Sequence, residues 1–370
     1  MLHGNRQKRF RIMSLHELLG TEGDETLSGA VASLNSAKVI PMQKVSPFQR
    51  AWLELFEGRK AGHMGAFEYA NGGMKLWDQF LAENGTYDRY YIPLEEQALV
   101  ERCAHMSANL LKAAKTMKVT LVSRGPGTKF ASKEGALVRA FGVAGIEVAK
   151  VVYIDVSKPA LNQSMKEGKL LLPNADHEII TGDIFDPDTR HKYKVVGTEV
   201  GTCFGGTPMN AYGRHDMEPP YSAVEENLSG IRGQQRKGSH FIASYDHNQD
   251  RKSVEAAYAG QTEFAKHMLE IEQHLGMDTS DVDFVVDFNE STGILAHGFH
   301  FKNDKRFEVA GRTREIESGT TLFFNNSVKF TEEQTAICYA HSGYRYVELE
   351  ETNPIMADNG RMGYHHTLAA

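Results

Sequence analysis

The strongest constraint on the fold of this chain is an alternation of short apolar runs with amphipathic stretches between Val119 and Tyr245. The runs have the length of buried strands, and the stretches have the length and period of helices. Such an alternation is typical of a parallel sheet with right-handed helical crossovers. We therefore predict an α/β fold whose strands are Val119–Ser123, Val148–Asp155, Glu178–Thr181, Lys194–Glu199 and His240–Tyr245.

Helices are predicted between these strands and before them. A long amphipathic helix opens at Pro93, because proline is tolerated in the first turn. The predicted helices are Leu94–Lys115, Lys133–Phe141, Pro159–Leu171 and Tyr221–Arg236.

The pattern changes after residue 246. Alternating strands separated by turn residues indicate antiparallel pairing and do not continue the parallel series. The predicted elements are a helix over Val254–Leu275, strands over Phe284–Phe288, Ile294–Phe301 and Thr320–Phe330, a helix over Thr331–Tyr339 and a strand over Tyr344–Leu349. The segment from Pro47 to Tyr91 is helical in pattern and rich in aromatic residues, which indicates either core packing or a lid over a ligand.

Composition narrows the function classes. The formal net charge of −7 argues against nucleic acid as a partner, because phosphate binding needs a basic field. The three cysteines have no CxxC spacing, and the chain has neither a membrane-length apolar run nor a secretory signal, so we predict a cytoplasmic protein without a membrane partner. Its 16 histidines form no HExxH motif, no GxSxG is present, and no metal site is predicted.

Three short motifs follow the first three predicted strands in order. Gly125 and Gly127 come directly after the first strand, where a doubly wound sheet binds a nucleotide. Asp155 ends the second strand and could accept hydrogen bonds from both hydroxyls of a ribose. Asp183 and Ile184 follow the third strand, where a carboxylate could bind an adenine amino group beside an apolar neighbour. The order predicts a ligand with a ribose and a base but no phosphate, although capping aspartates in loops explain each motif taken alone.

With these motifs the chain resembles the histidine-specific family of methyltransferases that depend on S-adenosylmethionine (SAM). The resemblance extends from about residue 73 to residue 348. It rests on Tyr90-Tyr91-Ile92-Pro93, Gly125-Pro126-Gly127 with Lys133, Asp155, Gly182-Asp183, Ala257-Tyr258 and Ser327-Val328-Lys329-Phe330.

The resemblance implies a Rossmann-like class I methyltransferase sheet with a second, smaller α+β domain that covers the substrate. It also implies SAM as cofactor and S-adenosylhomocysteine as product. The expected domains are an N-terminal extension (1–44), a substrate-binding domain (45–93 and 247–330), a SAM-binding domain (94–246 and 331–352) and a C-terminal tail (353–370).

The resemblance also implies the site residues. Those expected to bind SAM are Gly125, Gly127, Lys133, Asp155, Asp183 and Ile184, and those expected to bind substrate are Tyr91, Thr202, Tyr258, Asn325 and Ser327. Tyr91 and Tyr258 are the catalytic candidates, as phenols that could hold an amine or relay its proton, although either could be a packed core tyrosine. The oligomeric state is left open.

The substrate side departs from the family pattern at two positions. Thr202 stands where the family has an asparagine that holds the substrate carboxylate, and Asn325 stands where it has a glutamate that binds an imidazole. Loss of one buried hydrogen bond commonly costs about 1–3 kcal/mol. We therefore expect N-methylation of a small amine, an amino acid or a histidine-like compound. The alternatives are another small acceptor methylated at oxygen, sulfur or carbon, and a SAM-binding protein without catalysis.

Overall fold

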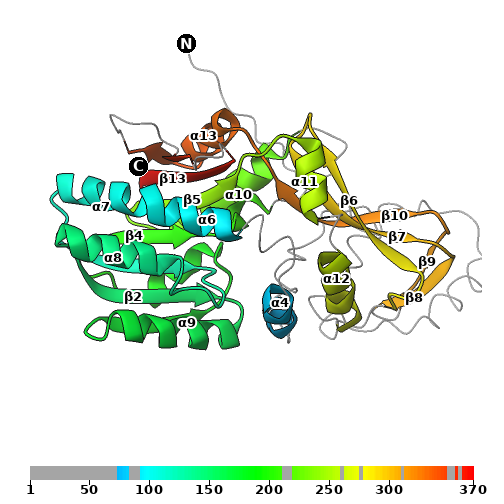
Figure 1. The fold of residues 1–370 in the computed structure, drawn as a ribbon, viewed down its shortest axis with the longest axis horizontal. Coiled ribbons are helices and arrows are strands. Elements are labelled where there is room, and N and C mark those ends of the chain that lie inside the picture. The colour runs from blue at the N-terminus through cyan, green and yellow to red at the C-terminus, as the bar shows by residue number, and fades with distance from the viewer. Residues whose placement is uncertain are drawn as a thin grey trace, which may run out of the picture. The chain divides into compact units, whose positions relative to one another are not determined.

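The computed structural model describes residues 73–82, 92–210, 219–258, 262–274, 278–309, 312–347, 355–356 and 361–370 (Figure 1). The chain divides into two units, Met1–Val45 and Ser46–Ala370, and no residue of the first belongs to the described part. The predicted N-terminal extension and Tyr91 therefore lie outside the described residues, and both stay predictions.

A mixed sheet forms the centre of the second unit. Its strand order is β11-β13-β5-β4-β1-β2-β3, and β12 pairs with β13 outside this path. The strands β1 to β5 run parallel, as predicted. Strand β13 is antiparallel to β5, and β11 is antiparallel to β13. Their bounds are β1 Lys118–Arg124, β2 Glu147–Asp155, β3 Asp176–Thr181, β4 Thr198–Cys203, β5 His240–Asp246, β11 Tyr344–Tyr346, β12 Ile355–Met356 and β13 Met362–Ala369.

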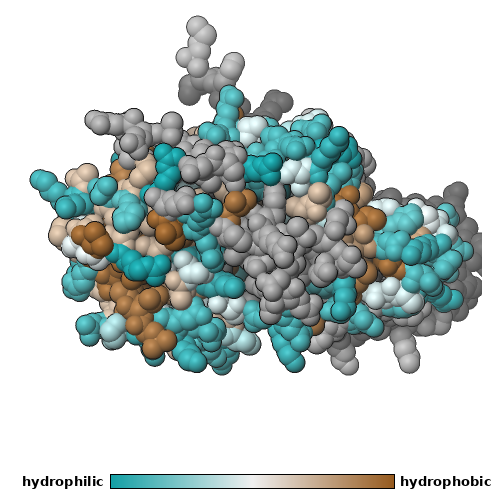
Figure 2. All heavy atoms as spheres, in the orientation of Figure 1, coloured by the Kyte–Doolittle hydropathy of each residue, from teal (hydrophilic) through white to brown (hydrophobic). Residues whose placement is uncertain are grey.

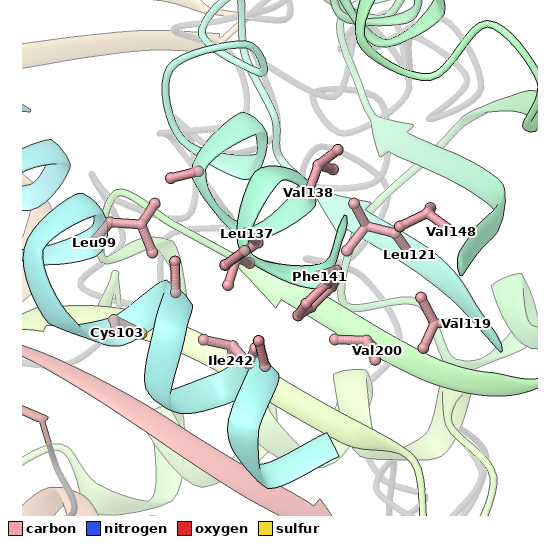
Figure 3. Packing of buried hydrophobic residues seen from close by; sticks show 14 of the residues in the cluster. Leu99, Cys103, Val119, Leu121, Leu137, Val138, Phe141, Val148, Val200 and Ile242 are labelled. Carbon is pink, nitrogen blue, oxygen red and sulfur yellow. The ribbon is translucent and has the colours of Figure 1, made fainter. Parts of the chain in front are cut away.

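Helices cover both faces of this sheet, because successive strand residues point to opposite sides. Leu121 of β1 packs in a core with Leu137 and Phe141 of α8, whereas the next residue, Val122, packs in the core beneath α10 and α13. Figure 3 shows side chains of the first core gathered between helices and strands. The helices on that side are α7 (Ala104–Ala113), α8 (Glu134–Ala144) and α9 (Lys158–Leu171), and those on the other are α10 (Tyr221–Gln234) and α13 (Glu332–His341).

The predicted long helix before β1 is present with an irregular turn inside it. It consists of α6 (Ile92–Ala98), a π-helical turn (Leu99–Cys103) and α7. Two short 3₁₀ helices, Pro187–Lys192 and Thr207–Met209, lie on either side of β4 in sequence.

Strand β4 begins later than the sequence indicates. The prediction was Lys194–Glu199, but the strand spans Thr198–Cys203. Gly197 explains the difference, because its φ of 74° makes a turn that L side chains rarely adopt. A Cβ on this glycine would also lie 2.1 Å from the carbonyl oxygen of Lys118. The apolar run before Gly197 is therefore a connection, and the strand follows the turn.

The prediction of a C-terminal tail over 353–370 is wrong for Met362–Ala369. These residues form β13, which lies between β5 and β11, and the side chains of His365 and His366 are fully buried. The polar residues of this segment did not indicate a buried strand. They can be buried because each imidazole forms a hydrogen bond with another histidine in or beside the sheet. His366 contacts His240 at 2.9 Å between ring nitrogens, and His365 contacts His247 at the same distance.

The segment between β5 and α13 carries a separate antiparallel sheet, as predicted, with strand order β10-β7-β6 (Figure 1). A hairpin of β8 and β9 was not predicted. The predicted helix over Val254–Leu275 corresponds to α11 and α12, and residues 259–261 lie outside the described part. The bounds are α11 Arg251–Tyr258, α12 Thr262–His274, β6 Val282–Asn289, β7 Ile294–Phe301, β8 Lys305–Val309, β9 Arg312–Ile316 and β10 Thr321–Val328.

One N-terminal helix packs on this segment. Trp77 of α4 (Gly73–Ala82) joins the apolar core of the segment, and its ring lies 5.5 Å from that of His267 on α12. Most of residues 45–93 lie outside the described residues, and the expected grouping of 45–93 with 247–330 in one domain stays a prediction.

Few large apolar side chains of the described residues are exposed. They are Val100, Met117, Val143, Leu170, Val196 and Ile337. Figure 2 shows separate apolar areas among polar side chains on one face. No helix in the described part of the chain is long and apolar enough to cross a lipid bilayer.

Candidate functional site

The glycine loop after β1 lies beside the residues that follow β3. Gly125 and Gly127 have φ angles of 63° and 57°, a conformation that glycine adopts without strain. The nearest atom to a Cβ built on Gly125 would be Cδ1 of Ile184, at 3.9 Å. A side chain at position 125 would therefore touch Ile184, and we call the group of Gly125, Gly127, Asp155 and Ile184 at these strand ends the cradle.

Asp155 ends β2 beside this loop. Its Oδ1 accepts a hydrogen bond from the amide of Ser157 at 2.8 Å, and the amide of Gly127 also donates to its carboxylate. Burial raises the pKa of Asp155, and these backbone donors oppose that rise. The backbone donors thus fix the carboxylate at the end of β2, beside the glycine loop, where it can accept further hydrogen bonds from hydroxyl groups.

The loop after β3 completes this side of the site. The amide of Gly182 donates to the carbonyl oxygen of Asp155 at 3.0 Å, which joins the ends of β2 and β3. Ile184 is buried, whereas Asp183 is exposed and its Oδ1 accepts the amide of Phe185 at 2.9 Å. Asp183 thus makes the local turn contact that was the simpler interpretation of this motif, and a base-binding role for it stays a prediction.

Lys133 and Glu95 meet at the switch point of the sheet, between β1 and β4, where doubly wound folds bind their ligands. Nζ of Lys133 lies 2.7 Å from Oε2 of Glu95. Glu95 comes from α6 and is fully buried, and its Oε1 accepts the amide of Gly205 at 2.6 Å and the hydroxyl of Ser244. Lys133 was expected from the sequence but Glu95 was not, because nothing in the sequence near α6 indicates contacts with Gly205 and Ser244, which are more than 100 positions away.

A second buried carboxyl, that of Glu134, lies beside this pair. Its Oε1 accepts hydrogen bonds from the hydroxyls of Ser123 on β1 and Thr202 on β4, the latter at 3.1 Å. Burial raises the pKa of Glu134 to about 7, and these hydrogen bonds only partly oppose the rise. Thr202, predicted to bind substrate, lies on β4 opposite Ser123 of β1, is fully buried and donates its hydroxyl to Glu134.

Two predicted substrate residues come together on one lysine. Nζ of Lys329, which follows β10, lies 3.2 Å from the hydroxyl of Tyr258 and 3.2 Å from that of Ser327. The same ammonium lies 3.3 Å from Oδ2 of Asp246, and both partners of this ion pair are almost completely buried. Because an ammonium can only donate, the two hydroxyls accept from it. Lys329 stood in a family motif, but its ion pair with the end of β5 was not foreseen.

Asn325 lies on β10 opposite His297 of β7. The imidazole of His297 is buried, with its ring 5.4 Å from that of Tyr258, and burial together with the charge of Lys329 lowers its pKa to about 3. The carboxamide oxygen of Asn325 accepts the amide of Asn326 at 3.0 Å. Asn325 therefore borders a group formed by Asp246, Tyr258, His297, Ser327 and Lys329, which we call the β5–β10 cluster.

The arrangement has two parts. The glycine loop, Asp155 and Ile184 form a cradle at the ends of β1 to β3, and the β5–β10 cluster begins where β5 ends. The described residues contain no group of three or more histidine, cysteine, aspartate or glutamate side chains that could hold a metal ion.

Comparison with known proteins gives one strong match. The model of the family described as "Histidine-specific methyltransferase, SAM-dependent" matches residues 64–352. A search of curated proteins finds no match.

Solved structures of low identity share parts of the fold. A SAM-dependent methyltransferase from Clostridium acetobutylicum is 10% identical, with 73% of this chain and 93% of that chain covered and a TM-score of 0.38. The CcbJ methyltransferase from Streptomyces caelestis is 12% identical, with 72% and 89% covered and a TM-score of 0.38. A 1,6-didemethyltoxoflavin-N1-methyltransferase from Burkholderia thailandensis is 11% identical, with 80% and 88% covered and a TM-score of 0.35.

Proposed function

We infer that this chain, which belongs to the family of histidine-specific, SAM-dependent methyltransferases, methylates a nitrogen atom of a small amine. The acceptor is an amino acid or a histidine-like compound. The observation that carries the proposal is the convergence of Gly125, Asp155 and Ile184, three residues selected from separate motifs, around one cradle.

The residues of the cradle fit SAM. The absence of a side chain at Gly125 and Gly127 would let a ligand approach the backbone, and the Asp155 carboxylate is the group that would accept the two ribose hydroxyls. Ile184 offers an apolar surface for the adenine ring. Lys133 stands at the switch point, where its ammonium would bind the carboxylate end of the cofactor.

Bound SAM supplies an electrophilic methyl group, so that a nitrogen–carbon bond forms as the sulfur–carbon bond breaks, and the acceptor nitrogen then loses a proton to solvent. The protein has to align the nitrogen lone pair and bind the amine in its unprotonated form. Tyr258 and Ser327 are the residues we assign to the acceptor, with Lys329 fixing their hydroxyls. The neutral imidazole of His297 adds no positive charge beside an incoming amine.

Two residues of the expected substrate site, Thr202 and Asn325, suggest that the substrate is not histidine or that histidine is bound in another way. Thr202 is committed to Glu134 in the interior, and Asn325 brings no charge to the β5–β10 cluster. Within that cluster the charge of Asp246 is balanced by Lys329. An acceptor group without a positive charge is therefore favoured over an imidazolium ion.

Isothermal titration with SAM and with S-adenosylhomocysteine tests the cofactor side. We expect micromolar binding to the wild-type protein and its loss in Asp155→Ala. Asp176→Ala, a change at the exposed start of β3, is the control and should bind as the wild type does. Absence of heat with both ligands in the wild type would refute the proposal.

A panel of amines and amino acids, with histidine first, then tests the acceptor by mass detection of the methylated product. Mass gains on a phenol, thiol or carbon compound would favour the alternative acceptors. Binding of SAM with no methylated product from any small molecule would favour a SAM-binding protein without catalysis, for which the changes at Thr202 and Asn325 are the supporting feature.

A further inference from the structure

Glu95 connects three elements at the switch point through one carboxylate. Its two oxygens contact Lys133 before α8, the amide of Gly205 after β4 and the hydroxyl of Ser244 on β5. The backbone carbonyl of Glu95 also accepts the hydroxyl of Tyr364 on β13, which fixes the first turn of α6 against the sheet. The carboxylate therefore has a defined position relative to the ends of β1, β4 and β5.

A buried carboxylate at this position is not explained by packing alone. Removal of an ionised carboxyl from water costs several kcal/mol, and apolar residues fill such sites without that penalty. The amide and hydroxyl donors compensate the burial of one oxygen. The other oxygen is directed to Lys133, whose side chain is 13% exposed, whereas that of Glu95 is 0% exposed. The pair thus extends from the interior to the surface of the site.

The Lys133 ammonium contacts a carboxylate on its buried side. An ammonium has three N–H groups, and among the described residues Glu95 is the ion-pair partner within 4.0 Å. Gly205 lies next to it, since a Cβ on that glycine would be 3.8 Å from Nζ, and its φ of 88° is a backbone conformation that L side chains rarely adopt. Burial would lower the pKa of Lys133, but the charge and the hydrogen bond of Glu95, together with the charges of Glu134 and Glu96, keep that pKa above its ordinary value.

We propose that Glu95 is a positioning residue of the cofactor site, which orients the Lys133 ammonium and the Gly205 loop toward the carboxylate end of SAM. The assignment rests on the proposed function, because Lys133 acts here as a cofactor-binding residue. Glu95 itself stays behind Lys133 and does not touch the cofactor. Its effect on affinity therefore passes through Lys133.

A double-mutant cycle on S-adenosylhomocysteine affinity tests this coupling. The variants are Glu95→Gln, Lys133→Met and the double variant, measured by isothermal titration. Gln keeps an acceptor for Gly205 and Ser244 and removes only the charge facing Lys133. We expect each single change to weaken binding about tenfold or more, and the double variant to bind no more than about threefold more weakly than the weaker single variant.

Two controls separate positioning from a merely structural role. Lys133→Arg keeps the cation and should retain affinity within about threefold, and Ser244→Ala removes one neutral contact of Glu95 and should do the same. If Glu95→Gln does not fold, the double variant of Glu95→Met with Lys133→Met is compared with Lys133→Met alone, because exchange of both members of a buried ion pair for apolar groups is often tolerated, whereas removal of one is not. Equal affinities are then expected, and a further loss in the double variant would overturn the role of Glu95. Thermal unfolding of each variant without ligand establishes that it is folded.

The outcomes distinguish the two proposals. Wild-type affinity in the Glu95 variant, or a double variant whose loss is the product of the single losses, would overturn the role of Glu95. An unchanged affinity in Lys133→Met would also overturn it while leaving the methyltransferase proposal intact. Failure of the wild-type protein to bind S-adenosylhomocysteine would refute the proposed function itself.

Discussion

Nε2 of His247 and Nε2 of His365 lie 2.9 Å apart in the interior beside β5 and β13. The carbonyl oxygen of Phe330 is 2.7 Å from Nδ1 of His247, so this nitrogen carries the proton and Nε2 accepts. His365 must then donate from Nε2 and accept at Nδ1 from the hydroxyl of Tyr346, at 2.6 Å. Both rings are neutral in this chain of hydrogen bonds, in agreement with the lowering of both pKa values by burial.

Acid should destabilise the protein through its buried histidines. Burial lowers the pKa of His240 from 6.5 to about 4, so below pH 6.5 the unfolded chain takes up a proton that the folded chain does not. The free energy of unfolding therefore falls as pH drops, by about 2 kcal/mol for one such histidine between pH 7.5 and 5. The free energy of unfolding, measured with urea at several pH values in this range, should depend less steeply on pH in His240→Gln than in the wild type. The exposed-site control His191→Gln should retain the wild-type slope.

Glu134 should give the opposite pH dependence. Its pKa is raised from 4.5 to about 7 by burial, so the folded state holds a proton that the unfolded chain releases. Its contribution to stability is complete below pH 4.5 and is lost as pH rises to about 7, a change of about 3 kcal/mol. Glu134→Gln keeps the acceptor for Ser123 and Thr202 and should be more stable than the wild type at pH 8 but not at pH 4.5. An equal gain for Glu333→Gln on the surface would contradict this cause.

Gly125→Ala should weaken cofactor binding. The change introduces strain of about 1–2 kcal/mol at positive φ and places a methyl group in the cradle facing Ile184. Gly145→Ala is the matched control, since Gly145 has a φ of 78° at the end of α8 and the nearest atom to a Cβ built on it is also 3.9 Å away. Both variants should lose stability, and only Gly125→Ala should lose affinity for S-adenosylhomocysteine in titration. Equal affinities would place the cofactor elsewhere.

Lys329→Met should cost about 3–5 kcal/mol of unfolding free energy, because it deprives the buried Asp246 of its ammonium. The double variant with Asp246→Asn should recover part of that loss. Titration should show that Lys329→Met still binds S-adenosylhomocysteine, because the cradle lies at other strands, while methyl transfer to the acceptor is reduced. Loss of cofactor binding in the folded variant would show that the two parts of the site are not separate.

Asn325→Glu should improve the use of histidine as acceptor. A carboxylate beside Ser327 can accept an imidazole N–H, a gain of about 1–3 kcal/mol that corresponds to tenfold or more in affinity. The measurement is the KM for histidine with kcat determined in parallel. Asn325→Gln, which adds length without charge, should leave the KM unchanged, and an equal change in both variants would exclude a charge effect.

Much of the sheet could be predicted because its apolar strands and amphipathic helices are local patterns. The same reasoning failed at β13, where His365 and His366 are buried only because partners from β5 and its end meet them. It also failed at β4, where a single turn at Gly197 shifts the strand.

The candidate site was predictable where the residue type and its place at a strand end together indicate a role, as for the carboxylate of Asp155 at the end of β2. It was not predictable for Glu95 or Asp246, whose roles depend on partners distant in sequence. Glu95 has an ordinary explanation as an acidic residue in the first turn of a helix, so nothing local in the sequence indicates a buried ion pair there.

The chain leaves the main sheet at Asp246–His247, and at Lys329–Phe330 it comes back to the core that covers one face of that sheet, just before α13. These two points are joined by the Lys329–Asp246 ion pair, by the hydrogen bond from His247 to Phe330 and by one from Gln249 to the Lys329 carbonyl. A segment whose ends meet in this way can change in length or sequence with little effect on its host. If the acceptor binds at the β5–β10 cluster, as proposed, sequence changes in the β6–β10 segment would alter acceptor specificity while the strands that hold the glycine loop keep their path.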